Sequence, residues 1–98
     1  MRYVVDIETT SECDLTSCGA WVYAEHPTTR ILCIAWCDAD SDSPPESCDI
    51  RQPIEAWADA RDKLLAASKL IAHNAQFERL CLSRIDSPSW DEAGRWLD

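Results

Sequence analysis

Two acidic residues stand one position apart in the first apolar segment of the chain. Asp6 and Glu8 lie in the run Tyr3-Val4-Val5-Asp6-Ile7-Glu8, whose β-branched content predicts a buried strand. Residues i and i+2 of a strand point to the same side, so both carboxylates leave one face. Like charges at that spacing are unfavourable unless a cation lies between them, and Mg²⁺ and Mn²⁺ prefer oxygen ligands. The same pattern also fits a strand whose Ile7 faces the core while both carboxylates face water.

A second group of polar residues lies in His73-Asn74-Ala75-Gln76-Phe77-Glu78, where a short strand leads into a helix. Asn74 and Glu78 are four residues apart, on one face of the first helical turn. A carboxylate there lies beside the end of a parallel strand, the usual place for a ligand site in an open α/β sheet. Ordinary capping explains the same residues, because Asn74 can accept from free N–H groups and Glu78 favours the helix N-terminus.

Taken together, these segments resemble a known enzyme family. Residues 5–10 resemble the first motif (Asp-x-Glu) of the DEDD superfamily of 3′–5′ exonucleases. Residues 72–78 resemble the second motif, an Asn followed four residues later by an acid. The likeness is strongest to proofreading domains of phage-type family A DNA polymerases, whose Gly-Ala-x-x-Tyr-Ala-x-His-Pro segment is matched by residues 19–27. The resemblance extends over about residues 3–85 and covers motifs in the same order.

The resemblance implies a ribonuclease H-like fold and hydrolysis assisted by two metal ions, Mg²⁺ or Mn²⁺. Asp6 would bridge both ions, Glu8 would bind one of them, and Glu78 would hold the second. These three residues are therefore the predicted catalytic and metal-binding set. Family members more often carry Asp at the position of Glu78. The Glu in this sequence is therefore a departure from the family pattern, and one that the phage-like subgroup tolerates.

The resemblance also implies a substrate, the 3′ end of single-stranded DNA, and a phage-encoded protein in the cytoplasm of a bacterial host. Asn74 would orient the site, while Thr9 and Phe77 would contact the terminal nucleotide. The helical spacing of Phe77 fits an ordinary core residue as well. RNA is an open alternative as substrate.

The third motif of the family, a Tyr or His four residues before an Asp, has no counterpart in this sequence. The residues four positions before Asp86, Asp91 and Asp98 are Leu, Ser and Gly. The isolated chain is therefore expected to be weak or inactive, because a metal ligand and a water-orienting residue are missing. A polymerase or another second polypeptide could complete the domain. The alternatives are a non-catalytic remnant that acts as a binding or assembly module, and a small acidic protein whose similarity is incidental.

Six elements must position these residues. Strands are predicted over residues 3–8, 31–37, 48–51 and 70–73, and helices over 53–68 and 74–85, with a helical turn before Pro27. The order predicts an α/β fold with a ribonuclease H-like mixed sheet, in which an antiparallel three-strand meander is followed by a parallel strand. The sheet is expected to be truncated before the last strand and helix. The predicted domain spans residues 1–86, and residues 87–98 form a tail of weakly helical pattern.

Composition limits the classes of protein further. The chain of 98 residues has 18 acidic and 9 Lys or Arg side chains, so its net charge is −9 and it suits a single domain. That charge argues against salt-driven binding to nucleic acid by the chain alone, although bound divalent metals would cancel it locally. No apolar run approaches the ~20 residues of a membrane span, so a soluble cytoplasmic domain is expected.

Two further patterns contain residue types that could bind a metal. Six cysteines occur without C-x-x-C spacing, so most are expected to be buried thiols rather than zinc ligands or disulfides. Asp38-x-Asp40-x-Asp42 imitates the start of a calcium loop, but the sixth position is Ser43 and the twelfth is Asp49. A solvated loop explains this segment better.

Overall fold

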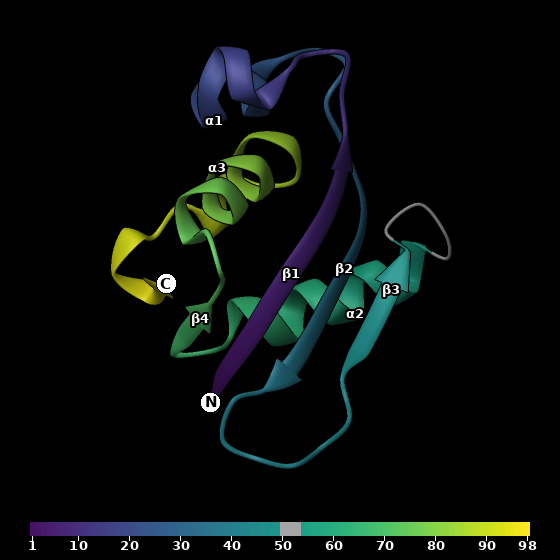
Figure 1. Ribbon diagram of the computed structural model, residues 1–98. Coiled ribbons are helices and arrows are strands. Elements are labelled where there is room, and N and C mark those ends of the chain that lie inside the picture. The colour runs from purple at the N-terminus through teal and green to yellow at the C-terminus, as the bar shows by residue number, and fades with distance from the viewer. Residues whose placement is uncertain (50–53) are drawn as a thin grey trace.

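A five-stranded sheet in the order β3-β2-β1-β4-β5 organises the chain (Figure 1). The computed structural model describes residues 1–49 and 54–98, without the side chains of Ile54 and Ala93. The strands are β1 (Arg2–Thr10), β2 (Arg30–Asp38), β3 (Glu46–Asp49), β4 (Lys69–Ile71) and β5 (Trp96–Leu97). The helices are α1 (Leu15–Glu25), α2 (Ile54–Leu65) and α3 (Ala75–Ile85), and short 3₁₀ turns follow at Pro88–Trp90 and Ala93–Arg95.

The sheet is mixed, as the sequence predicts. β1 pairs antiparallel with β2, and β2 with β3, whereas β1 and β4 are parallel. Helix α2 passes behind the sheet and carries the chain from the β3 edge to β4 (Figure 1). This crossover confirms the α/β class and the meander followed by a parallel strand. Two predicted boundaries, at residues 50–51 and at Pro53, fall outside the described residues.

Strand β1 has one covered face and one open face. Tyr3, Val5 and Ile7 are buried in the core, whereas Asp6 and Glu8 are exposed. The strict alternation confirms that Asp6 and Glu8 share a face, because successive side chains of a strand point to opposite sides. The helices add further residues to the core, including Leu64, Leu80 and Leu82.

The prediction that the sheet ends before a fifth strand was wrong. β5 pairs parallel with β4, with Leu70 opposite Trp96 and Ile71 opposite Leu97. Burial of aromatic surface explains why the tail folds back. Trp90 is 1% exposed and stacks on Trp57 of α2, with ring centroids 6.3 Å apart.

Asp86, the C-cap of α3, provides the polar partner that these buried indoles need. Its carboxylate accepts hydrogen bonds from Trp57 Nε1 at 3.1 Å and Trp90 Nε1 at 2.7 Å. Arg61 approaches the same carboxylate at 3.4 Å. One side chain therefore joins α2, the end of α3 and the tail.

Helix α1 begins earlier than the helical turn predicted before Pro27. Asp14 is its N-cap and accepts from the Thr16 N–H, and the helix ends at Glu25. Gly19 interrupts it with φ +79, a conformation that favours glycine because there is no Cβ to clash.

The cysteines differ in part from expectation. Cys13 and Cys18 form a disulfide across the start of α1, which the sequence analysis did not predict. Cys33, Cys37 and Cys48 are free and half-buried, and Cys81 is free and fully buried. Burial raises the pKa of the Cys81 thiol to about 12, so it behaves as a small apolar side chain.

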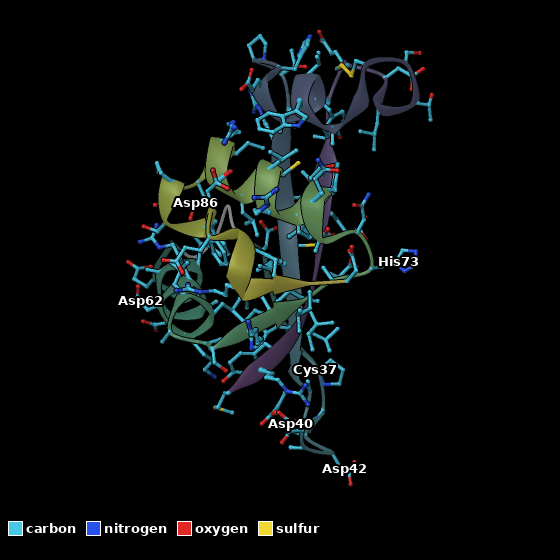
Figure 2. All side chains as sticks on the ribbon, turned by 90° about the vertical axis from the view of Figure 1, so that its left-hand side faces the viewer. Cys37, Asp40, Asp42, Asp62, His73 and Asp86 are labelled. Carbon is cyan, nitrogen blue, oxygen red and sulfur yellow. A yellow bond between two sulfur atoms is a disulfide. The ribbon has the colours of Figure 1, made fainter. Side chains whose placement is uncertain are left out.

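The loop between β2 and β3 lies apart from the helices, where Figure 2 labels Asp40 and Asp42 at one end of the molecule. Both are exposed, and Asp40 pairs with Arg2. In the part of the chain that the structure describes, no helix is both long enough and apolar enough to cross a membrane.

Replacing Trp90 tests whether the tail belongs to the cooperative core. Trp90→Ala should lower the free energy of unfolding by about 3–5 kcal/mol, because a fully buried indole leaves a cavity. Trp21→Ala is the matched control: Trp21 is 52% exposed, and its contact beneath Arg84 is worth about 0.5–1 kcal/mol. Urea denaturation followed by circular dichroism measures both. Equal losses in the two variants would contradict the assigned burial.

Candidate functional site

The candidate site lies where β1 continues beyond the end of β4. The two parallel strands pair only from Arg2 opposite Lys69 to Val4 opposite Ile71. Asp6 and Glu8 therefore lie past the last β4 residue, next to the connection into α3. This is the carboxyl edge of neighbouring parallel strands, where open α/β sheets place their ligand sites.

Two side chains satisfy the free N–H groups at the start of α3. Asn74 is the N-cap and accepts from the Phe77 N–H at 3.4 Å, as the sequence predicts. Asp98 accepts from the Ala75 N–H at 2.7 Å. The first turn of α3 is thereby held by Asn74, which directly precedes the helix, and by Asp98, which directly follows β5.

Glu78 lies in that first turn with its carboxylate buried. The residue is 5% exposed, and Oε2 has no hydrogen-bond partner among the described residues. The pKa of Glu78 is raised to about 7, mainly by burial and to a smaller extent by the charges of Asp6 and Asp98. A buried carboxylate with one oxygen unpaired and two other carboxylates near it is costly unless it is protonated or bound to a cation.

The predicted metal-binding residues are only partly brought together. The charge of Asp6 acts on Glu78, whereas Glu8 lies farther along β1, exposed and opposite Cys33. No group of three or more His, Cys, Asp or Glu side chains within residues 1–49 and 54–98 is arranged to hold a metal ion. The chemistry of the donors still suits a hard cation, since they are carboxylate oxygens and one of them is buried without a partner. The metal set Asp6, Glu8 and Glu78 stays a prediction.

The residues predicted to contact a nucleotide meet around Tyr23 of α1. The hydroxyl groups of Thr9 and Tyr23 are 2.8 Å apart, and the Phe77 and Tyr23 rings have centroids 5.7 Å apart. Phe77 is partly buried and packs against the core. The contacts of Thr9, Asn74 and Phe77 with a nucleotide stay predictions.

Two residues were missed by the sequence analysis. Tyr23 lies within the matched segment over residues 19–27 but was given no role. Asp98 directly follows the apolar pair Trp96-Leu97, which is the only local signal that it could end a strand. By contrast, His73 of the second motif is exposed and its side chain extends away from the strands (Figure 2).

Comparisons with known proteins give one significant relative. Over 86 residues the chain is 37% identical to a DNA polymerase of Bacillus phage SP02. The chain resembles part of a phage DNA polymerase. The match covers 82% of this chain and 12% of the relative. No family model matches the sequence, and no solved structure is significantly similar.

The buried carboxylate predicts a particular dependence of stability on pH. The folded chain binds the Glu78 proton more tightly than the unfolded chain, whose carboxyl has the ordinary pKa of 4.5. The stabilisation is present below pH 4.5 and is lost as the pH rises to about 7. The free energy of unfolding should fall by up to about 3 kcal/mol over that range in EDTA.

Glu78→Gln should remove this decline and unfold at higher urea concentration at pH 8. Glu12→Gln is the control, because Glu12 is exposed. Urea denaturation at pH 4.5, 6, 7 and 8 measures the effect. A Glu78→Gln profile that parallels the unsubstituted chain would show that another group causes the decline.

Proposed function

We propose that the chain is part of a 3′–5′ exonuclease domain that removes nucleotides from the 3′ ends of single-stranded DNA. The observation that carries the proposal is the buried Glu78 carboxylate at the carboxyl edge of β1 and β4, which lies in the field of Asp6 and whose Oε2 has no hydrogen-bond partner among the described residues. A structural residue at this place would be expected to have a hydrogen-bond partner or to be apolar. The similarity to a phage DNA polymerase supports a role beside polymerase activity.

In the proposed site, Asp6, Glu8 and Glu78 would hold two divalent cations. When bound, Mg²⁺ or Mn²⁺ would lower the pKa of a water molecule and stabilise the leaving oxygen of the phosphodiester. Glu78 would give up its proton on binding, because its carboxyl pKa of about 7 allows ionisation at neutral pH.

The terminal nucleotide is proposed to lie against Phe77, whose ring packs on the buried ring of Tyr23. Thr9 is held toward the same place by its 2.8 Å contact with the Tyr23 hydroxyl. Asn74 would act indirectly, because its side chain caps α3 and so fixes the turn that contains Glu78. A third motif would come from further polymerase sequence or from a second polypeptide.

A second candidate function is a non-catalytic assembly module. The face of the sheet that carries Asp6 is open, and Val4 on that face is 40% exposed. Val4, Ala35, Cys37 and Pro45 help to line a hollow of about 170 Å³ there. An exposed apolar sheet face of this kind is suited to covering by another polypeptide.

Metal binding should be visible as stabilisation. Mg²⁺ or Mn²⁺ should raise the Tm of the chain by mass action, and the double variant Asp6→Asn, Glu8→Gln should lose that response. Without metal the double variant should be the more stable protein, because two like charges are removed from one face. Differential scanning fluorimetry with and without about 5–10 mM metal measures both effects.

The double variant Glu12→Gln, Asp42→Asn is the matched control, since it removes the same two charges from exposed positions. It should keep the metal response of the unsubstituted chain. Equal loss of the response in both double variants would indicate non-specific screening of the −9 charge.

Activity distinguishes the two candidate functions. The 98-residue chain incubated with Mn²⁺ and a 5′-labelled oligonucleotide should shorten its 3′ end only at a trace rate, because two residues acting on one step are absent. A polypeptide that supplies a Tyr-x-x-x-Asp or His-x-x-x-Asp helix should restore stepwise shortening, and Asp6→Ala should abolish it. Absence of cleavage with the added polypeptide, despite complex formation, would favour the assembly module. Labelled RNA in parallel tests the nature of the substrate.

A further inference from the structure

Two hydrogen bonds tie the end of β5 to the connection from β4 into α3. The Leu97 carbonyl accepts from the Ala72 N–H at 2.9 Å, and Asp98 Oδ1 accepts from the Ala75 N–H at 2.7 Å. These contacts bracket the connection from β4 into α3, so this short segment is held at both ends from β5. The tail residue Asp98 therefore touches the helix at its first residue.

Ala75 and Glu78 are three residues apart and lie on the same side of α3. The hydrogen bond from Ala75 to Asp98 therefore acts on the turn that carries the Glu78 carboxylate. Glu78 Oε2 has no hydrogen-bond partner among the described residues, so its own contacts do not fix its direction fully. The position of the helical turn must do so instead.

We infer that Asp98 is a positioning residue for Glu78, holding the first turn of α3 so that the Glu78 carboxylate faces Asp6. The inference rests on the proposed function, because binding of a divalent cation is the reason why Glu78 would need to be held in this position. Asp98 acts through its hydrogen bond to Ala75 and not as a ligand. Outer residues that orient metal ligands commonly change metal affinity by roughly tenfold or more when they are replaced.

Three substitutions separate the hydrogen bond from the charge. Asp98→Asn keeps an oxygen acceptor at the same distance and removes the charge. Asp98→Glu keeps the charge and displaces the acceptor by one methylene, and Asp98→Ala removes both. Glu92→Ala is the matched control, because the Glu92 carboxylate pairs with Arg95 within the tail at 2.9 Å. Near-ultraviolet circular dichroism of the buried Trp90 and Trp96 establishes that each variant is folded.

The first measurement needs no metal. Three-bond couplings report the χ1 rotamer of Glu78, and amide exchange reports protection of the Ala75 N–H. Asp98→Asn and Glu92→Ala should keep one Glu78 rotamer and a protected Ala75 amide. Asp98→Ala and Asp98→Glu should give averaged couplings and about tenfold faster exchange at Ala75. A single unchanged rotamer in all four variants would overturn the inference.

The second measurement is the Mn²⁺ concentration at half-saturation, followed by the electron paramagnetic resonance signal of free Mn²⁺. Asp98→Ala and Asp98→Glu should raise it roughly tenfold, while Asp98→Asn stays close to the unsubstituted chain. An equal rise in Asp98→Asn and Asp98→Ala would overturn positioning in favour of a charge or ligand role. If the unsubstituted chain binds no Mn²⁺, the prediction of a metal site formed by Asp6, Glu8 and Glu78 of this chain alone fails, and the rotamer measurement still decides the role of Asp98.

Discussion

Strand β1 is central to the sheet, but its two neighbours cover it unequally. β2 pairs with it from Tyr3 to Thr10, whereas β4 pairs only with Arg2, Tyr3 and Val4. Beyond Val4, the described part of the chain places no strand on the β4 side of β1, and the first turn of α3 follows there. The acidic half of β1 and the helix N-terminus are thus brought together by the shortness of β4. A β4 longer by a few residues would separate Asp6 from Glu78.

This arrangement carries an electrostatic cost. Glu78 is buried without a hydrogen-bond partner for Oε2, and Asp6 and Asp98 add negative charge near it. Burial and like charges both favour the protonated carboxyl, so ionising Glu78 without a cation costs free energy. A divalent cation would reverse the sign of the local field, because carboxylates that repel one another become ligands. The proposed exonuclease role explains why a buried carboxylate with this electrostatic cost is present, because it would bind a cation. A role as an assembly module does not explain it.

The tail connects stability with the candidate site. Its first part is anchored by Trp90, which stacks on Trp57 and donates to Asp86. Its last residue, Asp98, accepts from the first N–H of α3. Trp96 lies between these two anchors and donates from Nε1 to the Trp90 carbonyl at 2.9 Å. The tail therefore connects α2 and the end of α3 with the start of α3. Substitutions at its tryptophans should also change the position of the first turn of α3.

The local geometry of the site follows from the spacing of residues along the chain. The i, i+2 spacing predicts that Asp6 and Glu8 share a face, because strand alternation depends only on the backbone. Asn74 is recognisable as an N-cap for the same reason, since its side chain reaches N–H groups in its own turn. The order of strands and helices likewise predicts the mixed sheet. The polymerase likeness is recognisable from short motifs whose residues are close together in the sequence.

Contacts between elements that lie far apart in the sequence depend on tertiary packing. The strand β5 has two residues, too few for a periodic signal, and it exists because the buried tryptophans bring the tail to β4. The contact of Asp98 with Ala75 spans 23 residues, and the disulfide of Cys13 with Cys18 depends on the turn into α1. The burial of Glu78 follows from the end of β4 and the direction of α3. Such features depend on the packing of whole elements, which residue spacing along the chain does not specify.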